Sequence, residues 1–177
     1  MTGEAKKFLE RLFNAVLTVL ILFYVVWLAL AYSGVGYYVP SESMKPVLMP
    51  GDLIVIKPVT VSQLVQQFEA GEEKPIIVFN NPYSDKPWVH RIYRVVYDEE
   101  GNVAGFQTKG DNNQQPDSYL VKPEDVRGEV VFRIPLLGYP IMFVKSEEGK
   151  IFVGLLLVIL ILSNLGFWAA SKGKSKV

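Results

Sequence analysis

The sequence has no cysteine and only one histidine, His90, among its 177 residues. The absence of cysteine excludes a disulfide framework, a cysteine nucleophile and a thiolate metal site. A single histidine excludes a multi-histidine metal centre and argues against a zinc site, so we expect no metal and no cofactor. Acidic and basic residues balance at 18 each. No long basic run marks a surface for nucleic acid, and we expect no nucleic-acid partner.

Charge is also absent from two long hydrophobic runs, residues 12–32 and 151–170. Each has the roughly 20 apolar residues that a helix needs to cross a bilayer. We therefore predict an N-terminal transmembrane anchor at 12–32 and a C-terminal transmembrane helix at 151–170. Two alternatives stay open. Ala29-Leu30-Ala31 resembles a signal-peptide cleavage site, although the apolar run is longer than such peptides have. Ser163 and Asn164 weaken the second run, which could instead lie at the membrane interface.

Basic residues outside both runs predict the orientation. They precede the first run and follow the second, at positions Lys6, Lys7, Arg11, Lys172, Lys174 and Lys176. Because basic flanks stay on the cytoplasmic side, both termini are expected to be cytoplasmic. The chain would then be a multi-pass protein of the cell membrane, in contact with lipid, with residues 33–150 on the outer side.

The region between the runs is rich in short strand-like segments. β-Branched and aromatic residues gather at 53–56, 76–79, 89–97, 103–108 and 128–134, with turn residues between them. The turn at 99–102 reads as a hairpin, and 62–70 has the spacing of a short helix. We expect a mainly β fold: a single compact β-rich catalytic domain, 33–150, flanked by two transmembrane α-helices.

Three polar places in this domain carry groups for nucleophilic catalysis: the segment 40–46, His90-Arg91, and 109–117. Serine needs a neighbouring base, histidine is the usual one, and a carboxylate orients the imidazole. Each place also has a structural explanation. A histidine in a strand can be a satisfied core residue, serines on loops cap turns, and Gly-Asp-Asn-Asn is a good turn sequence.

The three places together resemble the boxes of type I signal peptidases. Pro40-Ser41-Glu42-Ser43-Met44-Lys45-Pro46 with Gly51-Asp52 is similar to the nucleophile box, and His90-Arg91-Ile92 to the box of the general base. The segment from Thr108 to Asp117 is similar to the acidic box. The boxes follow the family's order across about residues 38–134, behind a hydrophobic anchor. Histidine in the second box resembles the archaeal and endoplasmic-reticulum branch, whereas the bacterial branch has lysine.

The resemblance implies a role for each matching residue. Ser43 would be the nucleophile and His90 the general base. Asp117 matches the proposed third member and Asp111 a second acidic position; the sequence does not decide which of them contacts His90. The Ser43 amide and the Ser41 hydroxyl would form the oxyanion hole. Glu42 departs from the family's usual glycine, so we expect it at negative φ, facing solvent or paired with Lys45.

The resemblance also implies the substrates: secretory preproteins, cut to release their signal peptides after small residues at the first and third positions before the bond. A substrate strand would run beside residues 36–40, and association with protein-export machinery is a further expectation. Three alternatives stay open. A related serine protease could mature a restricted set of surface proteins, a β domain could only bind partners, and a lysine, Lys86 or Lys109, could replace His90 as the base.

Overall fold

The computed structural model describes residues 3–34, 36–71 and 73–173. Lys174 and Lys176, used above for the orientation, lie outside the described residues. The chain divides into two compact units, one of residues 33–142 and one of the two terminal segments, 1–32 and 143–177. The units are described separately below.

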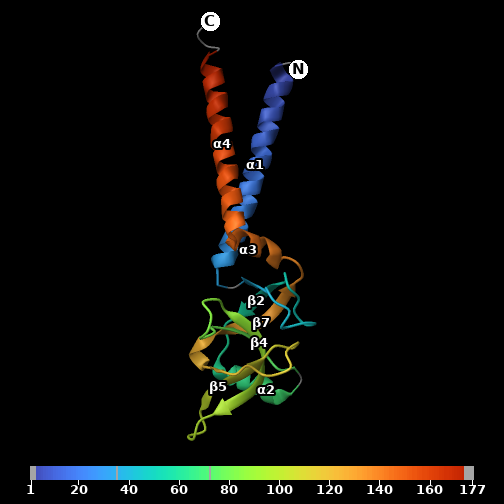
Figure 1. The fold of residues 1–177 in the computed structure, drawn as a ribbon, viewed down its shortest axis with the longest axis vertical. Helices are drawn as coiled ribbons and strands as arrows, with labels where there is room; N and C mark the ends of the chain where they lie inside the picture. Colours follow the sequence, from blue (N-terminus) through green and yellow to red (C-terminus); the bar gives the residue numbers. More distant parts are fainter. Residues whose placement is uncertain (1–2, 35, 72, 174–177) are drawn as a thin grey trace. The chain divides into compact units, whose positions relative to one another are not determined.

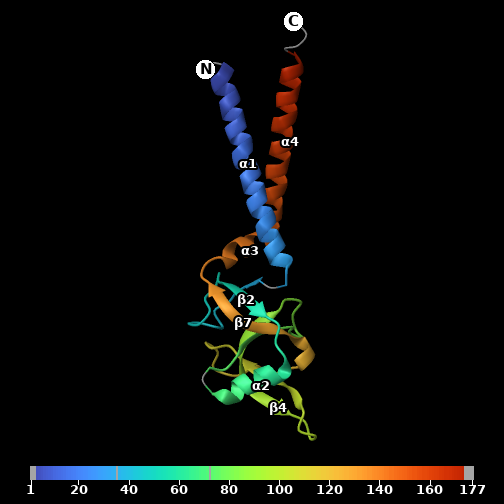
Figure 2. The same ribbon diagram turned by 180° about the vertical axis from the view of Figure 1, so that it is seen from behind.

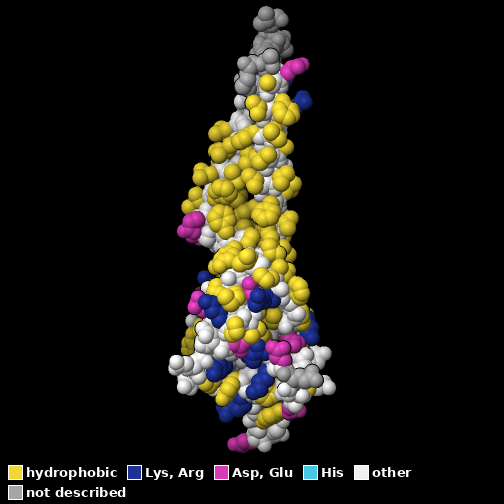
Figure 3. Space-filling view, turned by 90° about the vertical axis from the view of Figure 1, so that its right-hand side faces the viewer, with side chains coloured by type: hydrophobic (Ala, Val, Ile, Leu, Met, Phe, Trp, Pro, Cys, Tyr) yellow, Lys and Arg dark blue, Asp and Glu magenta, His cyan; other side chains and the backbone are white. Residues whose placement is uncertain are grey.

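The terminal segments form two long helices, α1 (Gly3–Tyr32) and α4 (Glu147–Gly173). They run side by side in opposite directions, so the first turn of α1 and the last turn of α4 lie at the same end of the pair (Figures 1 and 2). The stretches Lys7–Leu30 and Glu147–Gly166 are long and apolar enough to cross a membrane. Hydrophobic side chains cover the outside of both helices (Figure 3). Where the helices meet, Ser163 Oγ donates a hydrogen bond of 3.1 Å to Asn14 Oδ1.

The other unit is built on a seven-stranded sheet in the order β1-β2-β7-β3-β4-β5-β6. All its strand pairs are antiparallel. The strands are β1 (Gly36–Tyr38), β2 (Leu53–Lys57), β3 (Ile76–Phe79), β4 (Trp88–Tyr97), β5 (Val103–Lys109), β6 (Leu120–Val121) and β7 (Val126–Ile134). Between them lie helix α2 (Val61–Ala70) and a 3₁₀ turn, η1 (Pro123–Asp125). Helix α3 (Gly138–Lys145) follows β7, and the division between the units falls within it.

Strand β3 shows how the sheet makes two hydrophobic cores. Successive side chains of a strand point to opposite faces. Ile77 and Phe79 accordingly pack into one cluster, with Leu64 of α2 and Phe106 of β5. Val78 between them packs into the second cluster, with residues of the loop before β2. Because both faces are covered, a loop on either face can be anchored by apolar side chains.

The prediction of a mainly β domain flanked by two long apolar helices is confirmed. The expected strands appear as β2, β3, β4, β5 and β7, and the expected helix as α2. A capping box between Thr60 and Gln63 starts α2, and Gly71 at φ 80° ends it. Residues 98–102 join β4 to β5 as the expected hairpin, with Gly101 at φ 83°. The structure adds β1, β6 and α3.

Candidate active site

Ser43 lies in the loop between β1 and β2, and apolar side chains hold that loop down. Met44 is fully buried and Leu48 is 2% exposed, both in the second core cluster. Backbone hydrogen bonds join Val39 to Gly51 and Asp52 at the base of the loop, at 2.8 and 3.0 Å. Because its neighbour Met44 is anchored in the core, the half-buried Ser43 has a fixed place beside it.

Asp52 braces the same loop from inside. Its carboxylate is 1% exposed, accepts a hydrogen bond of 2.7 Å from the Met49 amide and lies 3.1 Å from Arg133 Nε. Arg133 also donates to the carbonyl of Val47, in the same loop. From the sequence, Asp52 was named only as part of the box that resembles the nucleophile box, and Arg133 was not named. The position of Asp52 directly after the turn glycine Gly51, at φ 86°, is the feature of the sequence that could have indicated its structural role.

His90 is placed by the alternation of β4. His90 and Ile92 are buried on one face of the strand, while Arg91 between them points to the other. The imidazole is 4% exposed and lies between aromatic rings, with centroids 5.6 Å from Trp88 and 6.3 Å from Phe79, both edge-to-face. Such packing limits rotation of the ring about its own axis.

The structure brings Ser43, His90 and Asp117 into one chain of hydrogen bonds. His90 Nε2 lies 3.2 Å from Ser43 Oγ, and His90 Nδ1 lies 2.6 Å from Asp117 Oδ2. With the proton on Nδ1, the imidazole donates to the carboxylate and can accept from the serine hydroxyl. This is the connectivity of a serine nucleophile, its base and an orienting acid.

Asp117 reaches His90 because its segment folds back on β5. The Asp117 amide donates to the carbonyl of Thr108 at 2.8 Å, and Gln107 Nε2 donates to the Asp117 carbonyl at 3.2 Å. The fully buried Thr108 hydroxyl donates to Asp117 Oδ2 at 2.6 Å, so this oxygen has two partners. Thr108 was named from the sequence only as the first residue of the segment similar to the acidic box. The sequence did not predict the hydrogen bond of its hydroxyl to Asp117.

Asp111 contacts Arg91 instead of His90. Its two oxygens accept from Arg91 Nε at 2.8 Å and Nη2 at 2.9 Å, a bidentate ion pair. The hydrogen bond with Asp111 raises the pKa of the Arg91 guanidinium, against the opposing effect of burial. Asp111 thus fixes the start of the loop between β5 and β6, residues 110–119, on the face of β4 opposite His90. We call this segment the acidic loop. Arg91 had no role assigned from sequence.

Hydrogen bonds join the acidic loop to the loop that carries Ser43. The Asn112 amide donates to the Ser43 carbonyl at 2.8 Å, and its side chain donates to the Glu42 carbonyl at 3.2 Å. Gly110 lies so close that a Cβ built there would be 2.7 Å from the Ser43 carbonyl oxygen. Glycine at 110 is therefore required by the close approach of two backbones.

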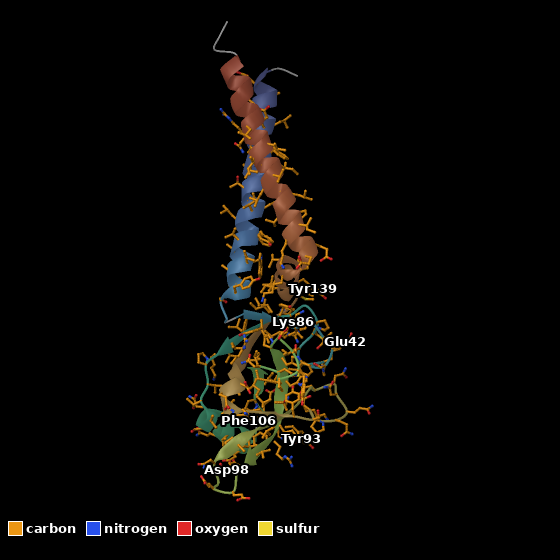
Figure 4. The ribbon with its side chains drawn as sticks, turned by 60° about the vertical axis from the view of Figure 1, so that its left-hand side comes forward. Glu42, Lys86, Tyr93, Asp98, Phe106 and Tyr139 are labelled. Carbon is orange, nitrogen blue, oxygen red and sulfur yellow. The ribbon has the colours of Figure 1, made fainter. Side chains whose placement is uncertain are left out.

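Ser41 and Glu42 directly precede Ser43 in its loop. Ser41 Oγ lies 3.2 Å from Ser43 Oγ, and either hydroxyl can donate. Glu42 faces solvent and accepts from Lys45 Nζ at 2.6 Å, the pairing expected from sequence. Figure 4 shows Glu42 at one end of the β domain and Asp98, in the β4–β5 hairpin, at the other. The candidate site therefore lies at the end of the domain away from that hairpin.

Tyr119 is partly buried near the carboxylate of Asp117. Its hydroxyl accepts from Asn81 Nδ2 at 3.0 Å. Burial, then the charge of Asp117, raises the pKa of the Tyr119 hydroxyl, and a hydrogen bond with Thr108 lowers it by less. A tyrosine hydroxyl is protonated near neutral pH at its ordinary pKa, and the raised pKa extends that range, so Tyr119 adds no second negative charge beside Asp117. The arrangement as a whole can activate a serine hydroxyl and return a proton to a leaving group.

Comparison with known families finds one matching model, described as signal peptidase, peptidase S26, over residues 9–96. This range includes Ser43 and His90 and ends before Asp117.

Curated relatives carry a corresponding name. A "Signal peptidase complex catalytic subunit SEC11" of Pyricularia oryzae is 37% identical over 106 residues, 56% of this chain and 57% of the relative. The protein of that name from Sclerotinia sclerotiorum is 30% identical over 133 residues, 70% of this chain and 73% of the relative. That from Lachancea thermotolerans is 30% identical over 134 residues, 70% and 75% of the two chains. The match to the Pyricularia oryzae protein thus spans little more than half of that protein's length.

Proposed function

Because the chain belongs to the signal peptidase family, peptidase S26, we propose that it is a membrane-bound serine endopeptidase that removes signal peptides from exported preproteins. One observation carries the proposal. His90 lies within hydrogen-bonding distance of both Ser43 and Asp117, which are far from it in the sequence, through one ring nitrogen each.

In the proposed reaction Ser43 Oγ attacks the carbonyl carbon before the cleaved bond while His90 Nε2 takes the hydroxyl proton. The C–N bond then breaks, and His90 gives that proton to the leaving amine. Water, activated by His90, hydrolyses the acyl-enzyme and restores Ser43. Asp117, held by the Thr108 hydroxyl, keeps Nδ1 protonated and stabilises the imidazolium that forms in each half of the reaction.

The oxyanion hole would be made by the Ser43 amide and the Ser41 hydroxyl. Ser41 Oγ lies 3.2 Å from the attacking oxygen, close to where the substrate's carbonyl oxygen develops charge. When Ser43 Oγ bonds to the substrate it loses its proton, and the Ser41 hydroxyl is then free to turn toward the oxyanion. Removing one such donor costs about a hundredfold or more in rate.

The substrates would be secretory preproteins with small residues at the first and third positions before the bond, running beside β1. Several relatives are named as catalytic subunits of a signal peptidase complex. We therefore include association with further subunits, or with protein-export machinery, in the proposal.

The two apolar helices would span the cell membrane with both termini in the cytoplasm. Their antiparallel pairing places the first turn of α1 and the last turn of α4 at one end, as two spans with tails on one side require (Figure 1). The β domain would then lie on the outer side, where exported chains emerge. A fluorescence-quenching or protease-protection assay on oriented vesicles tests this topology.

The deciding experiment uses a preprotein with an Ala-x-Ala site and detergent-solubilised protein. We expect wild type to cut at that site, and Ser43→Ala and His90→Ala to lose activity while remaining folded by circular dichroism. Ser62→Ala, at an exposed position of α2, is the matched serine control and should cut like wild type. If His90→Ala keeps full activity, the base is a lysine. If wild type with added membrane extract cuts nothing, the endopeptidase proposal is wrong.

A further inference from the structure

An open pocket of about 620 Å³ includes Asp117 in its lining, and its other lining residues have no part in the mechanism above. Its lining comes from the segment before and at the start of β4 and from the acidic loop: Tyr83, Trp88, Asn112, Asn113, Gln114, Gln115, Pro116, Asp117, Ser118 and Tyr119. All of these belong to the β unit.

Apart from the carboxylate of Asp117, the side chains that line the pocket are uncharged, and three of them are aromatic. The rings of Tyr83, Trp88 and Tyr119 meet edge-to-face, Tyr119 being 5.8 Å from Tyr83 and 6.2 Å from Trp88 between centroids. Tyr83 is 78% exposed and Trp88 38%, so both offer ring surface to a ligand. Four consecutive amide side chains, residues 112–115, supply donors and acceptors. Lining of this kind suits an uncharged, flat or apolar side chain next to a peptide backbone.

The pocket carries a bias against acidic ligands. Lysine and arginine are missing from its lining, and its one carboxylate is that of Asp117. That carboxylate is 8% exposed and is already bonded to His90 and Thr108. An acidic side chain entering the pocket would be repelled by Asp117 and would find no cation there to compensate.

The pocket adjoins the imidazole of His90, because Trp88 and Asp117, which both contact that ring, belong to its lining. Trp88 and His90 are alternate residues of β4, and their ring centroids are 5.6 Å apart. In the proposed reaction His90 Nε2 must reach the amine of the residue that follows the cleaved bond. A chain that places its amine at Nε2 and continues past the imidazole would reach Trp88, which lines the pocket. The part before the bond runs beside β1, which contributes nothing to this lining.

We propose that this pocket binds the first residues of the mature chain, those that follow the cleaved bond, and that it favours aromatic or apolar side chains and disfavours acidic ones. The inference rests on the proposed endopeptidase function and adds a second determinant of cleavage to the small residues before the bond.

The test uses three preproteins that share one signal peptide and its Ala-x-Ala site and differ only in the first two mature residues: Phe-Phe, Ala-Ala or Asp-Asp. We expect wild-type kcat/KM to be about tenfold higher for Phe-Phe than for Asp-Asp, a ratio of the size that aromatic contacts give. Tyr83→Ala should reduce this ratio to about threefold or less, and Tyr83→Phe, which keeps the ring, should retain it. Tyr97→Ala, at the opposite end of β4 from Trp88, is the matched control and should leave the ratio unchanged.

The outcomes separate this inference from the function on which it rests. If the Ala-Ala preprotein is cut but all three substrates are cut equally, or Tyr83→Ala keeps the full ratio, the pocket inference is wrong and the endopeptidase stands. If no preprotein is cut, the function fails and the inference falls with it.

Discussion

The hydrogen bond from Thr108 to Asp117 offers the sharpest test of the proposed mechanism, because one methyl-for-hydroxyl exchange removes it. Thr108 is fully buried, and its hydroxyl lies 2.6 Å from Asp117 Oδ2, the oxygen that also bonds His90 Nδ1. Thr108→Val keeps the shape of the side chain and deletes only the donor. Asp117 keeps its charge and its backbone bond to the carbonyl of residue 108.

The burial of the Asp117 carboxylate determines how much stability and activity Thr108→Val should lose. A hydrogen bond to a charged group contributes about 1.5–3 kcal/mol, and Asp117 is too buried for water to replace the donor easily. We expect Thr108→Val to lower the free energy of unfolding by about 1.5–3 kcal/mol and kcat by about tenfold. Asp117→Ala should cost far more, about 10⁴-fold in kcat, because the imidazole then loses its orienting partner altogether.

The assay is preprotein cleavage at saturating substrate, with urea unfolding measured in parallel. Ile92→Val is the matched control. It removes one buried methyl group near the same strand, costs about 0.5–1.5 kcal/mol of stability and should leave kcat within about twofold. Unchanged kcat in Thr108→Val, beside an inactive Asp117→Ala, would refute the idea that the threonine hydroxyl orients the carboxylate.

Three further changes test how the loops and helices are held. Asp111→Asn weakens the bidentate pair with Arg91, so urea unfolding should show a loss of about 1–3 kcal/mol while part of the cleavage activity remains. Gly110→Ala forces a Cβ to 2.7 Å from the nucleophile's carbonyl oxygen and should lower kcat about tenfold or more with an unchanged circular dichroism spectrum; wild-type activity would contradict the close approach. Asn14→Leu and Ser163→Ala each remove the polar contact between the long helices, and a double-mutant cycle in detergent should give a coupling of about 0.6 kcal/mol, whereas strict additivity would exclude that contact.

The sheet was predictable where its strands are long and apolar. Strands β3 and β4 begin or end within a residue of the ranges expected from sequence, because β-branched residues and turn signals mark both ends. Strands β1 and β6 have three and two residues, too few for alternation to show. Helix α3 was missed because Gly138 and Pro140 read as turn residues, although proline is tolerated in the first turn of a helix.

The candidate site was predictable in its residue types but not in its contacts. The sequence offered two acids and left open which of them meets His90. The structure resolves this contact through strand alternation: adjacent residues of β4 face opposite ways, so Arg91 meets Asp111 while His90 meets Asp117. No local sequence pattern predicts which acid meets which residue of β4, because these contacts depend on where the loop after β5 turns back. The catalytic roles of these residues stay predictions until the variants are assayed.

The contacts also explain how Glu42 fits next to Ser43, at a position where glycine is usual in the boxes that this segment resembles. A side chain at position 42 needs negative φ, and within the described part of the chain Leu136 is the one non-glycine residue at positive φ. Glu42 can therefore point outward to Lys45 while its carbonyl accepts from Asn112. The loop geometry is then fixed by the acidic segment and not by glycine at position 42. That same segment carries Asp117, so its folding sets both the place of Ser43 and the orientation of His90.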